Sequence, residues 1–135
     1  MKKDIPFLPV EGICIAVGKY VESPEETSWK VFLINKNNFV IENVLIGSKG
    51  YGYNADGEKQ ETSTLRHHIP LIEAGEYALV EPIDPNVFHL NNEYWVSYFI
   101  GNQIYDKKFI FVPDTIVETN MIFIPQINME GVLHP

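Results

Sequence analysis

The stretch TSTLRHH, from Thr62 to His68, gathers three hydroxyls, an arginine and two histidines in seven positions. Side chains alternate between the two faces of a strand, so an extended chain here presents four polar side chains on one face: Thr62, Thr64, Arg66 and His68. The guanidinium of Arg66 can bind a carboxylate or a phosphate with two parallel hydrogen bonds. The stretch is therefore a candidate site for an anionic group or an acidic peptide. The alternative is a polar edge strand that faces only solvent.

Metal and catalytic chemistry lack partners in this stretch. Adjacent His67 and His68 point to opposite faces of a strand, so one metal ion cannot bind both easily. The glycines of a nucleophile elbow are missing around Ser63, which argues against a hydrolase triad. The sequence predicts no catalytic residues, no metal site and no cofactor.

The segment KGYGYNADGE resembles two ligand-binding loops only superficially. It lacks the Gly-Lys-Ser/Thr ending of a phosphate-binding loop, and it lacks carboxylates at the ends of a calcium loop. We expect a flexible connection with two exposed tyrosines, Tyr51 and Tyr53. Loop tyrosines serve as recognition anchors or pack over the end of a β-sandwich.

Composition excludes several classes of partner. The chain has 135 residues, with 10 Lys and Arg against 18 Asp and Glu, and a net charge of −8. Such a charge opposes nonspecific binding to nucleic acid, which requires cations to neutralise phosphates. No apolar run approaches the roughly 20 residues that span a bilayer, so no membrane partner is expected. Cys14 is the only cysteine, and prolines and acids interrupt the start MKKDIPFLPVEG, so the sequence predicts a cytoplasmic protein without disulfides.

Strand signals dominate the chain, and they must position these residues. Segments rich in β-branched and aromatic residues alternate with turn-forming clusters such as SPEETS, EAGE and GNQ. The predicted strands are Gly12–Tyr20, Trp29–Asn35, Val40–Ser48, Glu58–His67, Glu76–Ile83, Glu93–Ile100 and Gln103–Val112. This spacing predicts an all-β protein, a single domain over residues 1–135, built as an immunoglobulin-like antiparallel β-sandwich of seven to eight strands.

Two hairpins and a core follow from the same pattern. WKVFLINKNNFVIENVLIGS predicts one hairpin, and EYWVSYFIGNQIYDKKFIFV predicts another with a Gly-Asn turn. Period-two spacing places two rows of side chains in a common core: Trp29, Val31 and Leu33 with Tyr94, Val96 and Tyr98.

Two resemblances add to this interpretation. WKVFLINKNN, IENVLIGS and IPLIEAGEYALVEPI resemble the order of strands and turns in bacterial immunoglobulin-like domains, over roughly Trp29 to Val112. WKVFLIN, TSTLRH, NEYWVSYF and EGVLH resemble a small, uncharacterised bacterial family that is sometimes labelled phenylalanyl-tRNA synthetase alpha subunit. Synthetase activity is not expected, because a synthetase catalytic core is a much larger mixed α/β domain.

The two ends of the chain also share a pattern. IPFLPVEGIC (Ile5–Cys14) and IPQINMEGVL (Ile124–Leu133) both carry Ile-Pro and then Glu-Gly at the same spacing. The match is either coincidence or a sign that both segments run as similar proline-bearing sheet edges.

Together these observations predict a non-enzymatic binding or scaffolding module, whose partner is another protein or a second copy of the chain. The alternative is a small-ligand or anion-binding protein that uses the polar stripe around Arg66. The binding module is expected to act through an exposed edge or loop. We also predict that Glu58–His67 lies at the edge of a sheet, where an unpaired strand can accept a partner.

Overall fold

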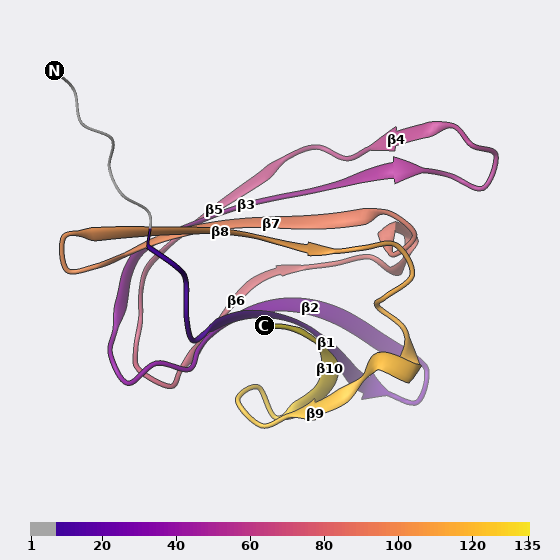
Figure 1. The fold of residues 1–135 in the computed structure, drawn as a ribbon. Coiled ribbons are helices and arrows are strands. Elements are labelled where there is room, and N and C mark those ends of the chain that lie inside the picture. The colour runs from indigo at the N-terminus through magenta and orange to yellow at the C-terminus, as the bar shows by residue number, and fades with distance from the viewer. Residues whose placement is uncertain (1–7) are drawn as a thin grey trace, which may run out of the picture.

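Two antiparallel β-sheets pack face to face in the chain (Figure 1). A computed structural model describes residues 8–135. One sheet, the β1 sheet, has the strand order β6-β2-β1-β10-β9. Its strands are β6 (Tyr77–Pro82), β2 (Glu26–Asn35), β1 (Ile13–Ser23), β10 (Met129–His134) and β9 (Ile122–Ile124).

The other sheet, the β3 sheet, has the order β4-β3-β7-β8. Its strands are β4 (Lys59–Glu61), β3 (Ile41–Tyr53), β7 (Asn91–Ile100) and β8 (Gln103–Phe111), and β5 (Leu65–Ile72) pairs with the same edge of β3 as β4. The prediction of an all-β, antiparallel protein is confirmed.

The ten strands of residues 8–135 exceed the predicted seven or eight. One predicted strand, Glu58–His67, is two strands, because the hydroxyl of Thr62 accepts a hydrogen bond from Gly50 N (2.7 Å) and the chain then leaves the ladder until Leu65. As predicted, this region is a sheet edge, since β4 and β5 pair with β3 alone among the described strands. The short strands β9 and β10 were missed, because three apolar residues and a glycine-containing segment carry little alternation.

The predicted hairpin of WKVFLINKNNFVIENVLIGS is wrong. β2 belongs to the β1 sheet and β3 to the β3 sheet, so residues 36–40 cross between sheets. Asn35 holds this corner: it is fully buried, and its side-chain amide donates to the carbonyls of Phe39 (2.9 Å) and Ile72 (3.2 Å). A crossing arch and a hairpin have the same pattern of apolar runs and asparagines, so the sequence does not distinguish them.

The second predicted hairpin is confirmed. β7 and β8 pair from Asn92 with Phe111 to Ile100 with Gln103, and the turn contains Gly101 at a φ of 58°. This positive φ is costly for residues with a Cβ, and glycine adopts it freely.

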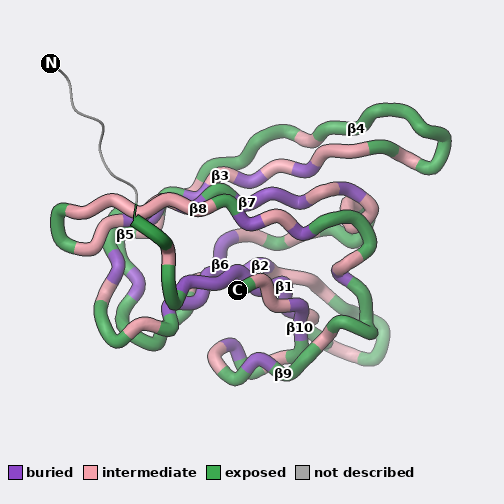
Figure 2. Tube along the Cα trace, in the orientation of Figure 1, coloured by how far each residue is buried: buried purple, intermediate pink, exposed green. Residues whose placement is uncertain are grey.

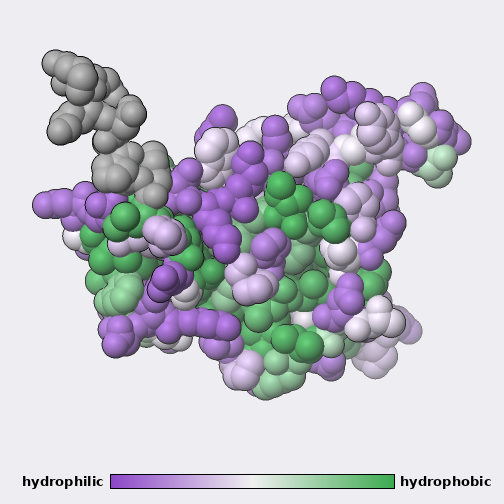
Figure 3. Space-filling model, in the orientation of Figure 1, coloured by the Kyte–Doolittle hydropathy of each residue, from purple (hydrophilic) through white to green (hydrophobic). Residues whose placement is uncertain are grey.

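β3 is longer than predicted, because KGYGY continues the strand instead of opening a loop. Tyr51 pairs with Glu61 and Tyr53 with Lys59, so both tyrosines lie on a two-stranded arm. The arm projects beyond the rest of the sandwich (Figure 1), and polar side chains cover it (Figure 3). The connection between strands is therefore confined to residues 54–58, a turn in which Asn54 Oδ1 accepts hydrogen bonds from the backbone of Asp56 and Glu58.

The predicted core is confirmed. Val31, Leu33, Tyr94, Val96 and Tyr98 are buried in one cluster between the sheets, and Trp29 packs against its margin. Buried segments follow the facing strands of both layers (Figure 2).

A second apolar cluster lies on the opposite face of the β1 sheet. Cys14, Ala16, Phe32 and Ile34 are buried there against Ile124 and Ile127, from β9 and the turn that follows it. Figure 1 shows this C-terminal hairpin curling under β1. The curl requires Gly131, since a Cβ at this position would lie 2.4 Å from the carbonyl oxygen of Val17.

The repeated Ile-Pro and Glu-Gly pattern does not mark equivalent segments. Residues Ile5 to Phe7 lie outside the described part of the chain. Glu11 and Gly12 precede β1, whereas Glu130 and Gly131 lie within β10, which pairs on both sides and is no edge.

The helical segments within residues 8–135 are two single 3-10 turns, Pro85–Val87 and Glu118–Asn120. No helix among these residues is long and apolar enough to cross a membrane.

Shortening one core residue tests this packing. Val96→Ala is expected to lower the free energy of unfolding by about 1–3 kcal/mol, from lost burial and the cavity left behind. Urea unfolding followed by circular dichroism measures the change. The matched control Val112→Ala, at a half-exposed valine, should stay within about 0.5 kcal/mol. Equal effects of the two variants would contradict the assigned core.

Alkaline pH should weaken the fold through its buried tyrosines. Burial, with a smaller effect of Tyr105, raises the pKa of Tyr98 from 10.0 to about 12. Between these pH values the unfolded chain ionises while the folded phenol stays neutral, so stability present below pH 10 is lost as the pH rises toward 12. Urea unfolding at pH 9, 10 and 11 should show a steeper loss in the natural protein than in Tyr98→Phe. Identical slopes would show that Tyr98 ionises equally in both states.

Candidate functional site

The outer face of the β3 sheet, directed away from the β1 sheet, carries a regular grid of side chains. Arg66 pairs with Gly47, Gly47 with Trp95, and Trp95 with Lys108, so these four positions form one row across β5, β3, β7 and β8. The next row consists of His68, Leu45, Ser97 and Asp106.

An open hollow of about 700 Å³ lies on this face. Its lining includes Leu45, Gly47, Thr64, Arg66, Trp95 and Lys108. Leu45 and Trp95 are 53% and 50% exposed, which is high for large apolar side chains in the middle of a sheet. The hollow is open above Gly47, where a Cβ would meet no atom within 4 Å.

The acidic side chains of the hollow already have partners. Glu93 Oε1 lies 3.5 Å from the hydroxyl of Tyr51 and 3.9 Å from Lys108 Nζ. Asp106 accepts a hydrogen bond from the indole N–H of Trp95, and Lys108 Nζ lies 4.8 Å from the centroid of the same indole. These contacts hold the Trp95 ring in one orientation.

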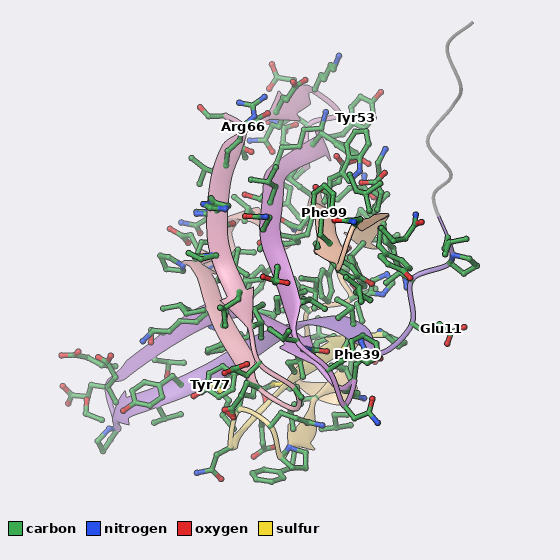
Figure 4. The ribbon with its side chains drawn as sticks, turned by 90° about the vertical axis from the view of Figure 1, so that its left-hand side faces the viewer. Glu11, Phe39, Tyr53, Arg66, Tyr77 and Phe99 are labelled. Atoms are coloured by element: carbon green, nitrogen blue, oxygen red, sulfur yellow. The ribbon has the colours of Figure 1, made fainter. Side chains whose placement is uncertain are left out.

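Arg66 differs from these residues. Within residues 8–135 its guanidinium makes no hydrogen bond, ion pair or ring contact, and its side chain is exposed. Figure 4 shows Arg66 on β5 toward the same end of the sheet as Tyr53, with Phe39 toward the other end. A guanidinium in this position can bind an anion without breaking an existing contact.

The position of Arg66 depends on a polar cluster behind it, between the two sheets. Glu81 of β6 accepts from Ser48 Oγ (2.8 Å) and from Tyr94 OH (3.1 Å), and it lies 2.6 Å from His67 Nε2. The carboxylate side chain is only 10% exposed. Burial, and then the charge and hydrogen bond of Glu81, raise the pKa of Tyr94, which stays a neutral donor.

This cluster has no geometry for nucleophilic catalysis. Ser48 and His67 both contact Glu81, so the serine hydroxyl donates to a carboxylate and no imidazole is placed to remove its proton. Ser63, the nucleophile considered from the sequence, has no side-chain hydrogen bond to a histidine among the described residues, and the same is true of Thr64. No three His, Cys, Asp or Glu side chains in residues 8–135 lie close enough to hold a metal ion together.

The structure brings part of the predicted stripe together. Arg66 and Thr64 line the hollow, and His68 lies on the same face, in the row of Leu45. His67 contacts Glu81 between the sheets, which confirms that the two histidines point to opposite faces. Thr62 is not part of the stripe, because its hydroxyl accepts from Gly50 N on the edge of β3.

The two tyrosines lie at different distances from the hollow. Tyr51 borders its lining, since the Tyr51 ring lies 5.6 Å from Lys49 Nζ and the hydroxyl contacts Glu93. Tyr53 is 66% exposed on the projecting arm and does not line the hollow.

Sequence reasoning missed the centre of the site: Leu45, Gly47, Trp95, Asp106 and Lys108. Two signals were available. Because Tyr94 and Val96 face the core, alternation directs Trp95 outward, where a large aromatic residue is uncommon. Gly47 interrupts a predicted strand, and a glycine in such a place often marks close approach of a ligand or another chain.

Comparison of the chain with known protein families, curated proteins and solved structures found no match. What the protein does must therefore be inferred from the site itself.

Removing the carboxylate behind the site should destabilise the fold. Glu81→Ala leaves Ser48, Tyr94 and His67 without their shared partner, which should cost about 2–4 kcal/mol of unfolding free energy. Urea unfolding at pH 7 measures the loss. Glu76→Ala, at an exposed glutamate just before β6, is the control and should stay within about 0.5 kcal/mol. A loss in Glu81→Ala no larger than in the control would mean that the cluster does not join the sheets.

Proposed function

We propose that the protein is a non-enzymatic binding module that recognises a partner protein with the outer face of its β3 sheet. The observation that carries this proposal is the hollow over Gly47, between half-exposed Leu45 and Trp95. Exposed apolar surface with a polar rim is typical of protein interaction sites.

Gly47 supports the proposal most directly. A glycine inside a strand costs about 0.5–1 kcal/mol relative to alanine. Packing does not require it here, since a Cβ would meet no atom within 4 Å, and its φ is not among the positive glycine values. A glycine that neither the backbone nor the packing needs is explained if another molecule occupies the space of the missing side chain.

Trp95 has the properties of an anchor for a partner. Tryptophan is enriched among the interface residues that contribute most to affinity, and a ring already held in place loses little entropy on binding. Asp106 and Lys108 hold the ring from its edge and its face.

The strand order supports an immunoglobulin-like fold as part of the proposal. The order β6-β2-β1 corresponds to strands E-B-A of immunoglobulin domains, and β5-β3-β7-β8 corresponds to C′-C-F-G. β9 and β10 extend the first sheet beyond strand A. We also propose a cytoplasmic location, which agrees with a single cysteine that is free and buried.

A small anion is the second candidate ligand. The guanidinium of Arg66, which has no partner within residues 8–135, favours it. Most small-ligand sites, however, enclose their ligand in a cleft, whereas this hollow is open along the sheet. A partner protein would use the apolar residues as well as the cation.

Filling the hollow tests the proposal. Gly47→Val places a β-branched side chain where the partner is expected, so it should abolish capture of the partner. It should raise the unfolding free energy, or leave it unchanged, because valine suits a strand better than glycine. Affinity capture from native cells, read by quantitative mass spectrometry, measures binding, and thermal unfolding measures stability.

The control for this experiment is Thr27→Val, at an exposed position of β2 in the other sheet. It should capture the same proteins as the natural chain. The proposal is wrong if Gly47→Val, correctly folded, captures those proteins equally well. Loss of stability in Gly47→Val would instead give the glycine a structural role.

A further inference from the structure

We infer that the occupant of the hollow is an extended segment of a partner protein, with a carboxylate side chain bound to Arg66 and an apolar side chain over Gly47. This inference rests on the proposed function and adds the chemistry of the partner. Three observations carry it: the charge that remains free around the hollow, the spacing of the row, and the apolar walls.

The free charge around the hollow is positive although the whole chain is acidic. The net charge is −8, but the two acids of the lining, Glu93 and Asp106, each have partners on this face. Arg66 has none among the described residues, and it lines the hollow. A guanidinium beside the hollow that is unpaired within residues 8–135 is complementary to a carboxylate.

The spacing of the row fits an extended peptide. Arg66 lies directly across from Gly47, and paired residues of antiparallel strands are about 4.5–5.5 Å apart. Residues two apart in an extended ligand face the same way and are about 6.6–6.8 Å apart. The long side chain of Arg66 spans the small difference. In an extended ligand, a carboxylate side chain therefore reaches Arg66 while the apolar side chain two positions away enters the hollow over Gly47.

The apolar walls favour a peptide over a free anion. Leu45 and Trp95 flank Gly47 on its own and the adjacent strand, and both are about half exposed. A carboxylate or phosphate alone would leave these surfaces in water. An aliphatic or aromatic side chain would cover them, which adds hydrophobic stabilisation to the ionic contact.

A random heptapeptide library displayed on phage and selected on the immobilised full chain tests the inference. The natural protein should enrich peptides with Asp or Glu two residues from Leu, Ile or Phe. Gly47→Val should enrich none of these. Arg66→Glu should enrich peptides with Lys or Arg at the former acidic position, while Lys59→Glu, the same charge change at an exposed residue of β4, should keep the acidic preference.

One enriched peptide then gives the affinities. In a Trp29→Phe background, Trp95 is the only tryptophan and its fluorescence reports binding. Arg66→Glu should weaken binding at least tenfold, and so should replacing the acid of the peptide by its amide. Melting temperatures of the natural protein and Arg66→Glu should agree closely, because exposed substitutions change stability little.

The outcomes separate the two proposals. Enrichment that is equal in Gly47→Val overturns the binding face itself. Enrichment that needs Gly47 but shows no acid, or survives Arg66→Glu unchanged, overturns only the inference. The inference is also overturned if no peptide is enriched, or if Arg66→Glu loses much thermal stability. Equal competition by glutarate and by the peptide would overturn it as well. Concentration-dependent dimerisation that Gly47→Val abolishes would identify a second copy as the occupant and overturn it too.

Discussion

The carboxylate of Glu81 is the interaction on which the two-layer arrangement depends. Glu81 belongs to β6 in one sheet, and its carboxylate contacts side chains from three strands of the other sheet: Ser48 of β3, His67 of β5 and Tyr94 of β7. A carboxylate that is only 10% exposed requires such partners, because an unpaired charge in a core is very costly. Apolar packing alone would allow one sheet to slide over the other. The hydrogen bonds of Glu81 are directional, so they fix the position of the two sheets relative to each other.

The same contact determines what the outer face presents. With His67 held against Glu81, alternation along β5 directs Arg66 and His68 away from the core. The register of β5 against β3 then places Arg66 across from Gly47. β5 therefore contributes His67 to the polar cluster between the sheets and Arg66 to the proposed binding face. A slip of β5 by one residue would turn each of these side chains to the opposite face.

The sequence alone predicted the all-β class, the facing rows around Val31 and Val96, the β7–β8 hairpin and the edge position of the TSTLRHH region. These follow from period-two alternation, which is local. The failures concern partners that are distant in sequence. Hairpins and arches share one pattern, so the crossing at Asn35 was not visible. Glu81 looked like any strand glutamate, because its donors come from three separate strands. Arg66 was identified from its chemistry, whereas Gly47 and Trp95 become a site only when β3 and β7 lie side by side.

The pairing of β1 with β10 has a consequence for biosynthesis. β1 is the first strand of the described chain and β10 the last, yet they are neighbours, and Gly131 allows their close approach. While the chain is being synthesised, β1 can pair with β2 long before β10 leaves the ribosome. During that interval one edge of β1 is open, and the Cys14 and Ala16 face lacks its cover of Ile124 and Ile127. An open edge beside an apolar face is a template for aggregation. Pairing across so much sequence is also slow to form. Nascent chains that stall before Met129 would therefore be the form of this protein most dependent on chaperones.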